Sequence, residues 1–524
     1  MFRRNAPSLV CLLLLSLLVV GCDGLTDVTE MNSDPTSATS MNPRLQFVNL
    51  PLAVHDGRFV NWRANLIHAE CISQHLASPF LAWSGCRYTR NVAYNTAFWG
   101  RNWGSLKNFE DVLQKTTPEE NPQLVNVHAM TRILRVFLMH RTTDLYGNIP
   151  YEQGGEGLTE GVQKPEYDPQ EEIYPAMITD LQEAREQLDP SVNTLDPARD
   201  LLFGDKSNRI EKWRRFANSL ILRLGMRMSE VAPDQAQSAV QDALNSGVMQ
   251  SNDDIVYTMH AESNGVRNGI GAVFNDFGKG GHGFRISKTF MDILKGTAGP
   301  SSMVDPRTSI FAAEYLESGN LASNDPAELE GMPNGLTTEQ IPDSTVQFAM
   351  PNYDFMVRED SPDLWMGYAE VKFLEAEAAL RGWHPNSSDV QAHYEEGIRA
   401  AMKHLTIYGA PEISDSAIQS YIDSLDPLPA DPNATLERII EQKWVALFLN
   451  GYESWAELRR TGYPDDITPV DFPGNVTGGE IPSRLIYPSG EANVNGENFE
   501  GGATQPNEMK TSLWWDTDGP ATIQ

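Results

Sequence analysis

The sequence predicts a mainly α-helical fold in which pairs of helices form a scaffold and long irregular segments are inserted between them. Apolar residues recur at spacings of three and four over several segments, which is typical of helices with one buried face. These segments come in pairs, separated by connections rich in Gly, Pro and Asn. The 524 residues would allow about three domains. Because 40% of them are hydrophobic, we expect one large core instead.

Four helix pairs are expected, followed in each case by a turn or a long connection. The first pair is interrupted by residues 146–150 (YGNIP), which predict the end of a helix because Gly and Asn tolerate positive φ and Pro blocks continuation. In the last pair, the spacing of Trp444, Phe448, Trp455 and Leu458 predicts core positions. Little helical periodicity is found in residues 251–285, 296–362 and 462–524. The predicted pairs are 124–143 with 170–188, 211–231 with 234–245, 364–381 with 390–405, and 436–450 with 452–460.

The third pair resembles a tetratricopeptide unit in its small residues. Ala376, Ala379 and Gly382 lie on its first helix, and Gly397 lies between Tyr394 and Ile398 on its second. Small residues allow paired helices to approach closely and stack on their neighbours. The spacing does not recur strictly, so we expect degenerate tetratricopeptide-like pairs interrupted by insertions.

The N-terminus has the features of an export signal. Arg3 and Arg4 precede an apolar run, residues 9–20, that is too short to cross a bilayer. The run ends in Val-Val-Gly-Cys22, which resembles the lipobox of bacterial lipoproteins. We therefore expect a signal peptide at 1–21, lipidation of Cys22, a polar tether at 22–43 and one domain at 44–524. A plain secretory signal with an incidental cysteine is the alternative.

Cys71 and Cys86 are the two cysteines that follow the N-terminal signal. An exported protein folds in an oxidising compartment, where this pair can form a disulfide. Two free thiols in a core are equally compatible with the spacing, so the sequence leaves both states open.

The charge balance excludes one class of partner. There are 40 Lys and Arg residues against 71 Asp and Glu, which gives a net charge of −31. Binding to a phosphate backbone needs clustered cations, so we expect no nucleic-acid partner. Only 12 of the cations are lysine. An acidic, lysine-poor surface suits a salty habitat, and an ordinary acidic secreted protein is the alternative.

Seven motifs, in order along the chain, resemble the SusD/RagB family of outer-membrane nutrient-binding lipoproteins of the Bacteroidota. The resemblance runs from the lipobox almost to the C-terminus. The motifs are TTDLYGNIPY (142–151), KPEYDPQEEIYPAMITDLQEA (164–184), KWRRFANSLILRLGMRMS (212–229), RISKTF (285–290) with DPR (305–307), YAEVKFLEAEAALRG (368–382), EQKWVALFLNGYESWAELRRTGYP (441–464) and IPSRLIYPSGEANVN (481–495).

This resemblance implies a function and a partner. Members of the family are lipid-anchored at the cell surface and bind oligosaccharides or, in some branches, peptides. They deliver these to a TonB-dependent outer-membrane transporter of the SusC type, over which they sit as a lid. The resemblance also implies a SusD-like α-α superhelix whose irregular insertions face the ligand.

The stretch from Pro79 to Phe109 is the best candidate for ligand binding, because it mixes aromatic residues with Arg and Asn. Aromatic faces stack on sugar rings or peptide side chains, while Arg and Asn donate hydrogen bonds to their oxygens. We expect Trp83, Arg87 and Tyr88, which flank Cys86 in a loop, to contact ligand, together with Tyr94. For Phe98, Trp99 and Trp103 we expect inward packing at the start of a helix.

A glycine cluster at residues 278–283 (GKGGHG) predicts a flexible loop near the ligand face. Phe277 and His282 are its candidate contacts. The cluster formally fits a dinucleotide-binding pattern, but the preceding FNDF is not a buried strand. We therefore expect no nucleotide cofactor here.

No catalytic or metal site is expected from the sequence. His68 and His75 are seven residues apart but lack a third ligand in a recognised spacing. No nucleophile motif accompanies the 71 carboxylates. Two alternatives remain for the function: a surface glycoside hydrolase, which needs a facing carboxylate pair, and a tetratricopeptide-type scaffold that binds only proteins.

Overall fold

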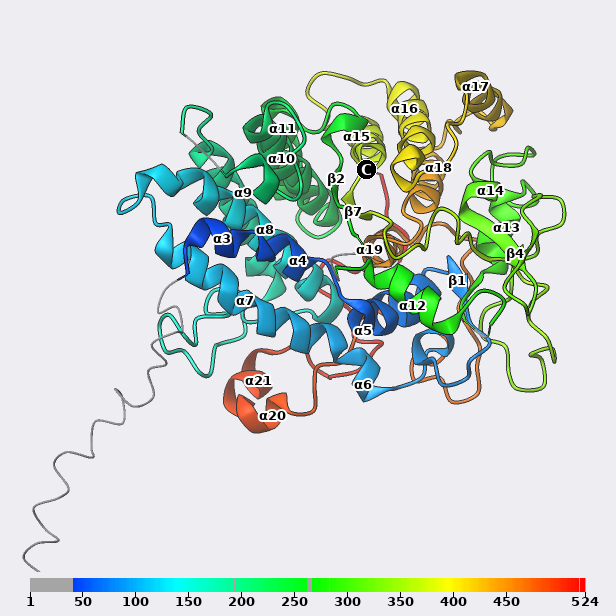
Figure 1. Cartoon of the computed structure of the whole chain (residues 1–524), viewed down its shortest axis with the longest axis horizontal. Helices are drawn as coiled ribbons and strands as arrows, with labels where there is room; N and C mark the ends of the chain where they lie inside the picture. Colours follow the sequence, from blue (N-terminus) through cyan, green and yellow to red (C-terminus); the bar gives the residue numbers. More distant parts are fainter. Residues whose placement is uncertain (1–40, 193–194, 262–265, 282, 518, 524) are drawn as a thin grey trace, which may run out of the picture.

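A computed structural model describes residues 41–192, 195–261, 266–281, 283–517 and 519–523. This part of the chain is built mainly of helices, and its strands are short (Figure 1). The mainly α-helical prediction is therefore confirmed. The signal peptide, Cys22 and most of the tether lie outside the described residues.

The four predicted helix pairs are present and stack in chain order. Helix α9 packs on α10, α10 on α15, and α15 on α18, so the pairs follow one another across the upper half of Figure 1. This arrangement confirms the tetratricopeptide-like scaffold. The pairs are α8 (Val125–Tyr146) with α9 (Gln170–Gln187), α10 (Arg209–Arg227) with α11 (Pro233–Ser246), α15 (Tyr368–Leu380) with α16 (Val390–Lys403), and α18 (Pro432–Ala446) with α19 (Gly451–Thr461).

Shorter elements surround this scaffold. The other helices are α3 (Pro43–Phe47), α4 (Asn49–Val54), α5 (Arg58–Val60), the π-helix η1 (Asn61–Glu70), α6 (Val92–Asn95), α7 (Ala97–Lys115), α12 (Gly269–Phe277), α13 (Lys288–Leu294), α14 (Thr308–Phe311), α17 (Asp415–Ser424), α20 (Glu491–Val494) and α21 (Gly496–Gly502), with 3₁₀ turns at η2 (Ser84–Arg87), η3 (Pro122–Leu124), η4 (Pro197–Arg199), η5 (Asn252–Asp254) and η7 (His404–Tyr408).

The strands form three small antiparallel sheets. Strand β1 (Leu76–Ala77) pairs with β3 (Arg285–Ile286), and β2 (Val256–Thr258) pairs with β7 (Asp363–Met366). In the third sheet β4 (Ala312–Tyr315) lies between β5 (Leu321–Ser323) and β6 (Met350–Pro351). The first two sheets join segments more than 100 positions apart in the sequence, and the third lies within residues 312–351.

Some helix boundaries differ from the sequence-based expectation, and one helix forms where little helical periodicity was found. Helix α18 covers Pro432–Ala446 where 436–450 was expected. The helix expected over 364–381 begins only at Tyr368, because Asp363–Met366 pairs with Val256–Thr258 as strand β7. Within 251–285, where little helix was expected, α12 forms over Gly269–Phe277. The Asn268 side chain caps it by accepting the Gly271 N–H at 2.9 Å.

Small residues set the spacing of the paired helices, as expected. A Cβ added at Gly397 would lie 2.7 Å from the Phe373 ring, so α16 could not approach α15 this closely with a larger residue. Helix α8 ends at Tyr146, where Gly147 takes a φ of 94°. The predicted core residues Trp444, Phe448, Trp455 and Leu458 are all buried.

Buried ion pairs join the central helices. Arg460 on α19 donates from both terminal nitrogens to the two Glu377 oxygens of α15, at 2.7 Å each, and it also binds Glu457 at 2.7 Å. Arg227 on α10 binds Glu453 at 2.6 Å, and Lys443 on α18 lies 3.0 Å from Glu457. These buried ion pairs connect the four helices α10, α15, α18 and α19.

Glu441 on α18 is a buried carboxyl group with few partners to replace the hydrogen bonds it would make in water. It is 2% exposed, and its Oε1 has no hydrogen-bond partner among the described residues. Burial raises its pKa to about 8; Arg438, with its Nη1 3.7 Å from Oε2, opposes this shift, and the nearby carboxylates of Asp466, Glu437 and Asp465 add to it.

Glu441→Gln is expected to stabilise the protein at pH 8 and to have little effect at pH 5. The folded pKa lies above the unfolded one, so the contribution of Glu441 to stability is present below about pH 4.5 and is lost as the pH rises toward 8. Each unit of pKa shift corresponds to about 1.4 kcal/mol. Urea unfolding at pH 5 and pH 8 measures the effect, with the exposed Glu172→Gln on α9 as control. Equal stabilisation at both pH values would contradict the account.

Candidate functional site

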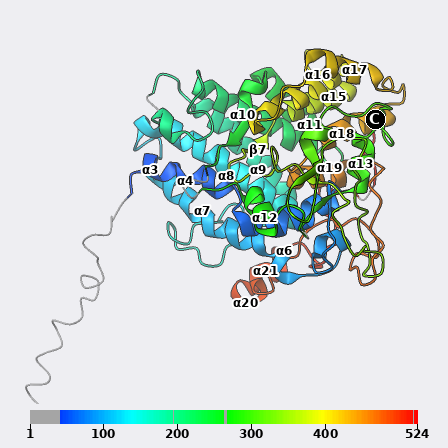
Figure 2. The same ribbon diagram turned by 45° about the vertical axis from the view of Figure 1, so that its right-hand side comes forward.

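An aromatic surface lies where η1, the loop before α6 and the end of α12 meet. We define the aromatic face as Phe59, Trp62, Phe80, Tyr94 and Phe277, which are half-buried or exposed around a buried Trp83. Helix α12 packs on α5 and η1, which brings Phe277 to residues more than 180 positions earlier in the chain. Figures 1 and 2 both show α12 above α6. The aromatic face is therefore assembled from segments that lie far apart in the sequence.

Trp83 is the centre of this cluster but not its surface. It is 3% exposed, and its ring centroid lies 4.8 Å from Phe80, 5.2 Å from Phe277 and 4.1 Å from Phe284. The ring centroid of Trp62 lies 6.3 Å from that of Trp83 and 5.6 Å from that of Tyr94. The buried indole thus supports the rings that reach solvent.

The outer edge of the aromatic face combines rings with cations. Phe59 is 59% exposed, and the Arg58 guanidinium lies 4.9 Å from its ring. Arg63 lies 5.5 Å from the Trp62 ring and 5.7 Å from that of Tyr94. Arg58 also pairs with Asp276 at the end of α12. Stacked guanidinium groups keep donors free at their edges, beside apolar ring faces.

Trp62 also has an unused donor. Its indole Nε1 is buried and makes no hydrogen bond to any residue that the structure describes. Buried donors usually have a partner in protein or water. The half-buried Trp62 ring offers a stacking face to a ligand, while its N–H lies beneath the surface.

The loop behind the face is held by covalent and polar contacts. Cys71 and Cys86 form a disulfide across 15 residues, so the structure takes the bridged alternative. Arg87 donates to the carbonyl oxygens of Phe80 at 2.6 Å, Ser78 at 3.0 Å and Leu336 at 3.2 Å. Burial lowers the pKa of the Arg87 guanidinium only to about 10, so it stays charged at neutral pH. These contacts brace the loop from behind the face.

The predicted contact residues divide into two groups. Tyr94 and Phe277 lie on the aromatic face. Trp83, Arg87 and Tyr88 are buried, so in this structure they brace the loop and do not present their side chains to a ligand. The physical reason is that Arg87 and Tyr88 turn inward beside the disulfide, where Tyr88 adopts a left-handed φ of 55°. His282 lies outside the described residues.

Phe59, Trp62 and Arg63 were not predicted from the sequence. They belong to a helical segment, RFVNWR, whose apolar residues show no clear amphipathic period. The alternation of aromatic residues with Arg in this hexapeptide was the available signal. His68 and His75, also on or after η1, bond separate partners: His68 Nδ1 lies 2.6 Å from Arg63 O, and His75 Nε2 lies 2.9 Å from Trp444 O.

A groove of about 600 Å³ is a second candidate surface. It lies between α7, the connection after α8, and α20, near the bottom of Figure 1. Phe98 and Trp99 pack inward as expected, and Trp99 Nε1 donates to Glu491 at 3.1 Å. Trp103 lines the groove together with the exposed Leu158. Fewer aromatic rings and no stacked guanidinium group were found here among the described residues.

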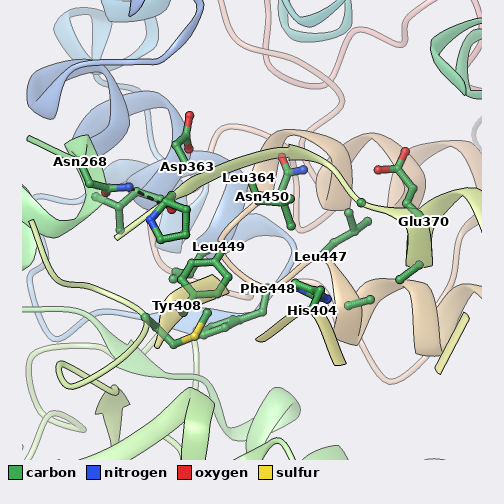
Figure 3. Close-up of a pocket in the computed structure, with 16 residues that line it drawn as sticks. Asn268, Asp363, Leu364, Glu370, His404, Tyr408, Leu447, Phe448, Leu449 and Asn450 are labelled. Atoms are coloured by element: carbon green, nitrogen blue, oxygen red, sulfur yellow. Dashed lines mark hydrogen bonds between the residues drawn. The ribbon is translucent and has the colours of Figure 1, made fainter. Parts of the chain in front are cut away.

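An internal cavity lies deeper in the fold, between β7, η7 and the end of α18 (Figure 3). Its walls include Asn268, Asp363, Glu370, His404 and Tyr408. The cavity volume of about 30 Å³ holds roughly two water molecules and no sugar ring. Burial would raise the pKa of Asp363, but His55 and Arg141 hold it at about 2. This cavity is a polar part of the core.

Comparison with known families decides what kind of protein carries this face. A profile of the SusD-like family, described as "Starch-binding associating with outer membrane", matches residues 53–488. The chain belongs to the SusD-like family. The family resemblance inferred from the seven motifs is thereby confirmed. A search of curated proteins finds no match to the chain.

Solved structures of SusD-like proteins share the fold over nearly the whole chain. A structure described as a chitin-binding protein is 29% identical, with a TM-score of 0.78 over 91% of this chain and 100% of its own. A chitin-binding SusD homologue from Flavobacterium johnsoniae is 26% identical, with a TM-score of 0.74 over 91% and 98%. A SusD homologue from Bacteroides uniformis is 25% identical, with a TM-score of 0.74 over 90% and 99%.

The family is described as associating with the outer membrane. In the described part of this SusD-like chain, every helix is too short or too polar to span a bilayer.

Proposed function

We propose that this SusD-like protein is a cell-surface lipoprotein that captures oligosaccharides on its aromatic face and delivers them to a SusC-type TonB-dependent transporter. The observation that carries the proposal is the aromatic face itself, which sets the exposed Phe59 ring and four half-buried rings beside two stacked guanidinium groups. Pyranose rings have an apolar face bordered by hydroxyls, so they match rings bordered by hydrogen-bond donors. The family's starch-binding description supports the same class of ligand.

The braced loop makes this face suited to binding. Ordering a loop or a rotamer-rich side chain on binding costs about 0.5–1.5 kcal/mol per side chain. The Cys71–Cys86 disulfide and the three Arg87 hydrogen bonds hold the loop in place beforehand. The free energy gained by stacking on the rings therefore does not have to offset a cost of ordering this loop.

Chitin oligosaccharides are the first ligands to test, since two of the similar solved structures are described as chitin-binding. Titration calorimetry with chitin oligosaccharides, malto-oligosaccharides and a peptide panel distinguishes the ligand classes. We expect saturable binding of an oligosaccharide. Binding of peptides alone would assign the protein to a peptide-binding branch and would refute the carbohydrate proposal.

We propose binding without catalysis. Chromatography of each oligosaccharide after incubation with purified protein tests this point. Release of shorter products would favour the glycoside hydrolase alternative. Absence of any small-ligand binding, together with capture of proteins, would favour the scaffold alternative.

The transporter partnership is tested on native membranes. Mild detergent extraction followed by pull-down of this protein is expected to recover a large β-barrel transporter. Recovery of the protein alone, at the same yield before and after crosslinking, would count against the delivery step.

Cys22→Ala is expected to release the protein from the membrane fraction into the soluble fraction. We propose that residues 1–21 are a signal peptide, that Cys22 carries the lipid, and that a tether over 22–43 leads to one domain over 44–524. Acyl chains contribute about 0.8 kcal/mol per buried CH₂, so a multiply acylated cysteine anchors the protein stably. Fractionation and immunoblotting measure the change, with Cys11→Ala as matched control. Retention of Cys22→Ala in the membrane would contradict the assignment.

A further inference from the structure

Two histidines and a glutamate lie close together between the two helices of the third pair and the connection that joins them. Glu375 lies on α15, His384 in the connection that follows, and His393 on α16. One ligand atom from each of the three lies within 4.8 Å of the others. His384 Nε2 is 3.8 Å from one Glu375 oxygen, and His393 Nδ1 is 3.5 Å from the other.

One of the two imidazoles lacks a partner at the nitrogen that faces the cluster. The His384 side chain is 8% exposed and that of His393 is 12% exposed. His384 Nε2 is buried and has no hydrogen-bond partner among the described residues, whereas His393 faces Glu375 through Nδ1. Buried nitrogens of this kind normally bind a partner, and His384 Nε2 is directed toward the carboxylate that the cluster shares.

We propose that Glu375, His384 and His393 bind a transition-metal ion of the zinc class. Zinc takes imidazole nitrogen and carboxylate oxygen at about 2.0–2.2 Å in tetrahedral geometry, with ligand atoms roughly 3.3 Å apart. The separations of 3.5 and 3.8 Å run to different Glu375 oxygens, and one ligand atom from each residue lies within 4.8 Å of the others, so the side chains must draw together to reach that geometry. A water molecule completes the fourth position. This site departs from the sequence-based expectation of no metal, because its ligands share no recognised spacing.

Two groups must move when the ion binds. Lys372 contacts Glu375 and has its Nζ 3.4 Å from His393 Nδ1, so its ammonium occupies the position of the cation. Its flexible side chain is 16% exposed and can turn to solvent. His384 Nδ1 accepts the Asn386 N–H at 3.2 Å. Ligation through Nε2 transfers the ring proton to Nδ1 and turns the exposed Asn386 N–H away.

The bound ion would act as a structural clip. It would tie α15 to α16 and fix the connection between them, at residues 381–389. It lies on elements of the scaffold, and none of its three ligands belongs to the aromatic face. The metal site and the proposed oligosaccharide site can therefore fail or succeed independently.

The test uses metal-free, tag-free protein titrated with ZnCl₂ by calorimetry. We expect one ion per chain, lost in Glu375→Gln, His384→Gln and His393→Gln and retained in His128→Gln, whose histidine lies outside the cluster. Lys372→Met removes the competing ammonium and is expected to bind roughly fivefold more tightly. Zinc should also raise the Tm of the wild type and leave that of His393→Gln unchanged.

Titration of the wild type with CoCl₂ gives a readout that needs no variant to fold. Visible d–d absorption of a four- or five-coordinate imidazole site supports the proposal, and its absence at saturation overturns it. Absence of zinc binding to Lys372→Met, or binding that survives both histidine substitutions, overturns it equally.

Discussion

Trp62→Ala is expected to weaken oligosaccharide binding roughly thirtyfold while leaving the fold intact. Loss of a central aromatic contact typically costs about 2 kcal/mol, which corresponds to that change in Kd. Trp62 is the ring that links the exposed Phe59 side of the aromatic face, through Arg58 and Arg63, to Tyr94 and Phe277. Its ring is half-buried, so one face of the indole remains available for stacking.

Titration calorimetry on the variant measures this effect, and two other tryptophans separate binding from folding. Trp383, in the connection after α15, is half-buried and belongs to none of the segments that form the face, so Trp383→Ala should bind as the wild type does. Trp83→Ala should lose about 3–5 kcal/mol of stability, because it empties the buried centre of the cluster. Equal affinity of Trp62→Ala and the wild type would reject the aromatic face as the binding site.

Arg460→Met is expected to lower the free energy of unfolding by about 3–5 kcal/mol. Arg460 is fully buried and makes four hydrogen bonds to the carboxylates of Glu377 and Glu457. Removing it leaves these carboxylates in the core with only part of their compensation. Arg399→Met on α16, a partly exposed arginine that lies 3.8 Å from Glu396, is the control and should cost at most about 1 kcal/mol.

The Arg460 variant should also become less sensitive to acid, so the stability difference from the wild type should narrow at low pH. Burial alone would raise the pKa of Glu457, but Arg460, Lys443 and Arg227 outweigh it and hold the pKa well below its usual range. The stabilisation from such a carboxylate is present above the unfolded pKa of about 4.5 and is lost as the pH falls toward the folded pKa. Without Arg460 the pKa of Glu457 rises, so the variant has less of this stabilisation to lose in acid. Urea unfolding between pH 3 and 7 measures both effects. A loss below 1 kcal/mol at pH 7 would show that the network is not stabilising.

The helix pairs were predictable because apolar residues recur at spacings of three and four, as in residues 124–143 and 170–188. Helix α9 buries one such face, whereas α8 is buried on nearly all sides. The split of 364–381 into β7 and α15 was not predictable. Its apolar residues suit either a helix or a buried strand, and only pairing with Val256–Thr258, over 100 positions earlier, decides the outcome.

The candidate site was predicted only in part, again because contacts between distant segments decide which side chains reach the surface. The sequence located the loop around Cys86 and named Tyr94 and Phe277. It could not separate Trp83, which is buried, from Trp62, which reaches the surface, because both are tryptophans in segments without clear periodicity. The metal cluster was invisible in the same way, since Glu375, His384 and His393 come together only when α15 and α16 pack.

The central claim is that the aromatic face holds the ligand. Its most direct test is a crystal structure of the protein with a chitin oligosaccharide, or with whichever oligosaccharide binds most tightly in the titrations. We predict a sugar ring stacked on Trp62 or Phe59, within hydrogen-bond distance of Arg58 or Arg63. An ordered sugar in the groove beside Trp103, with the aromatic face empty, would contradict the account.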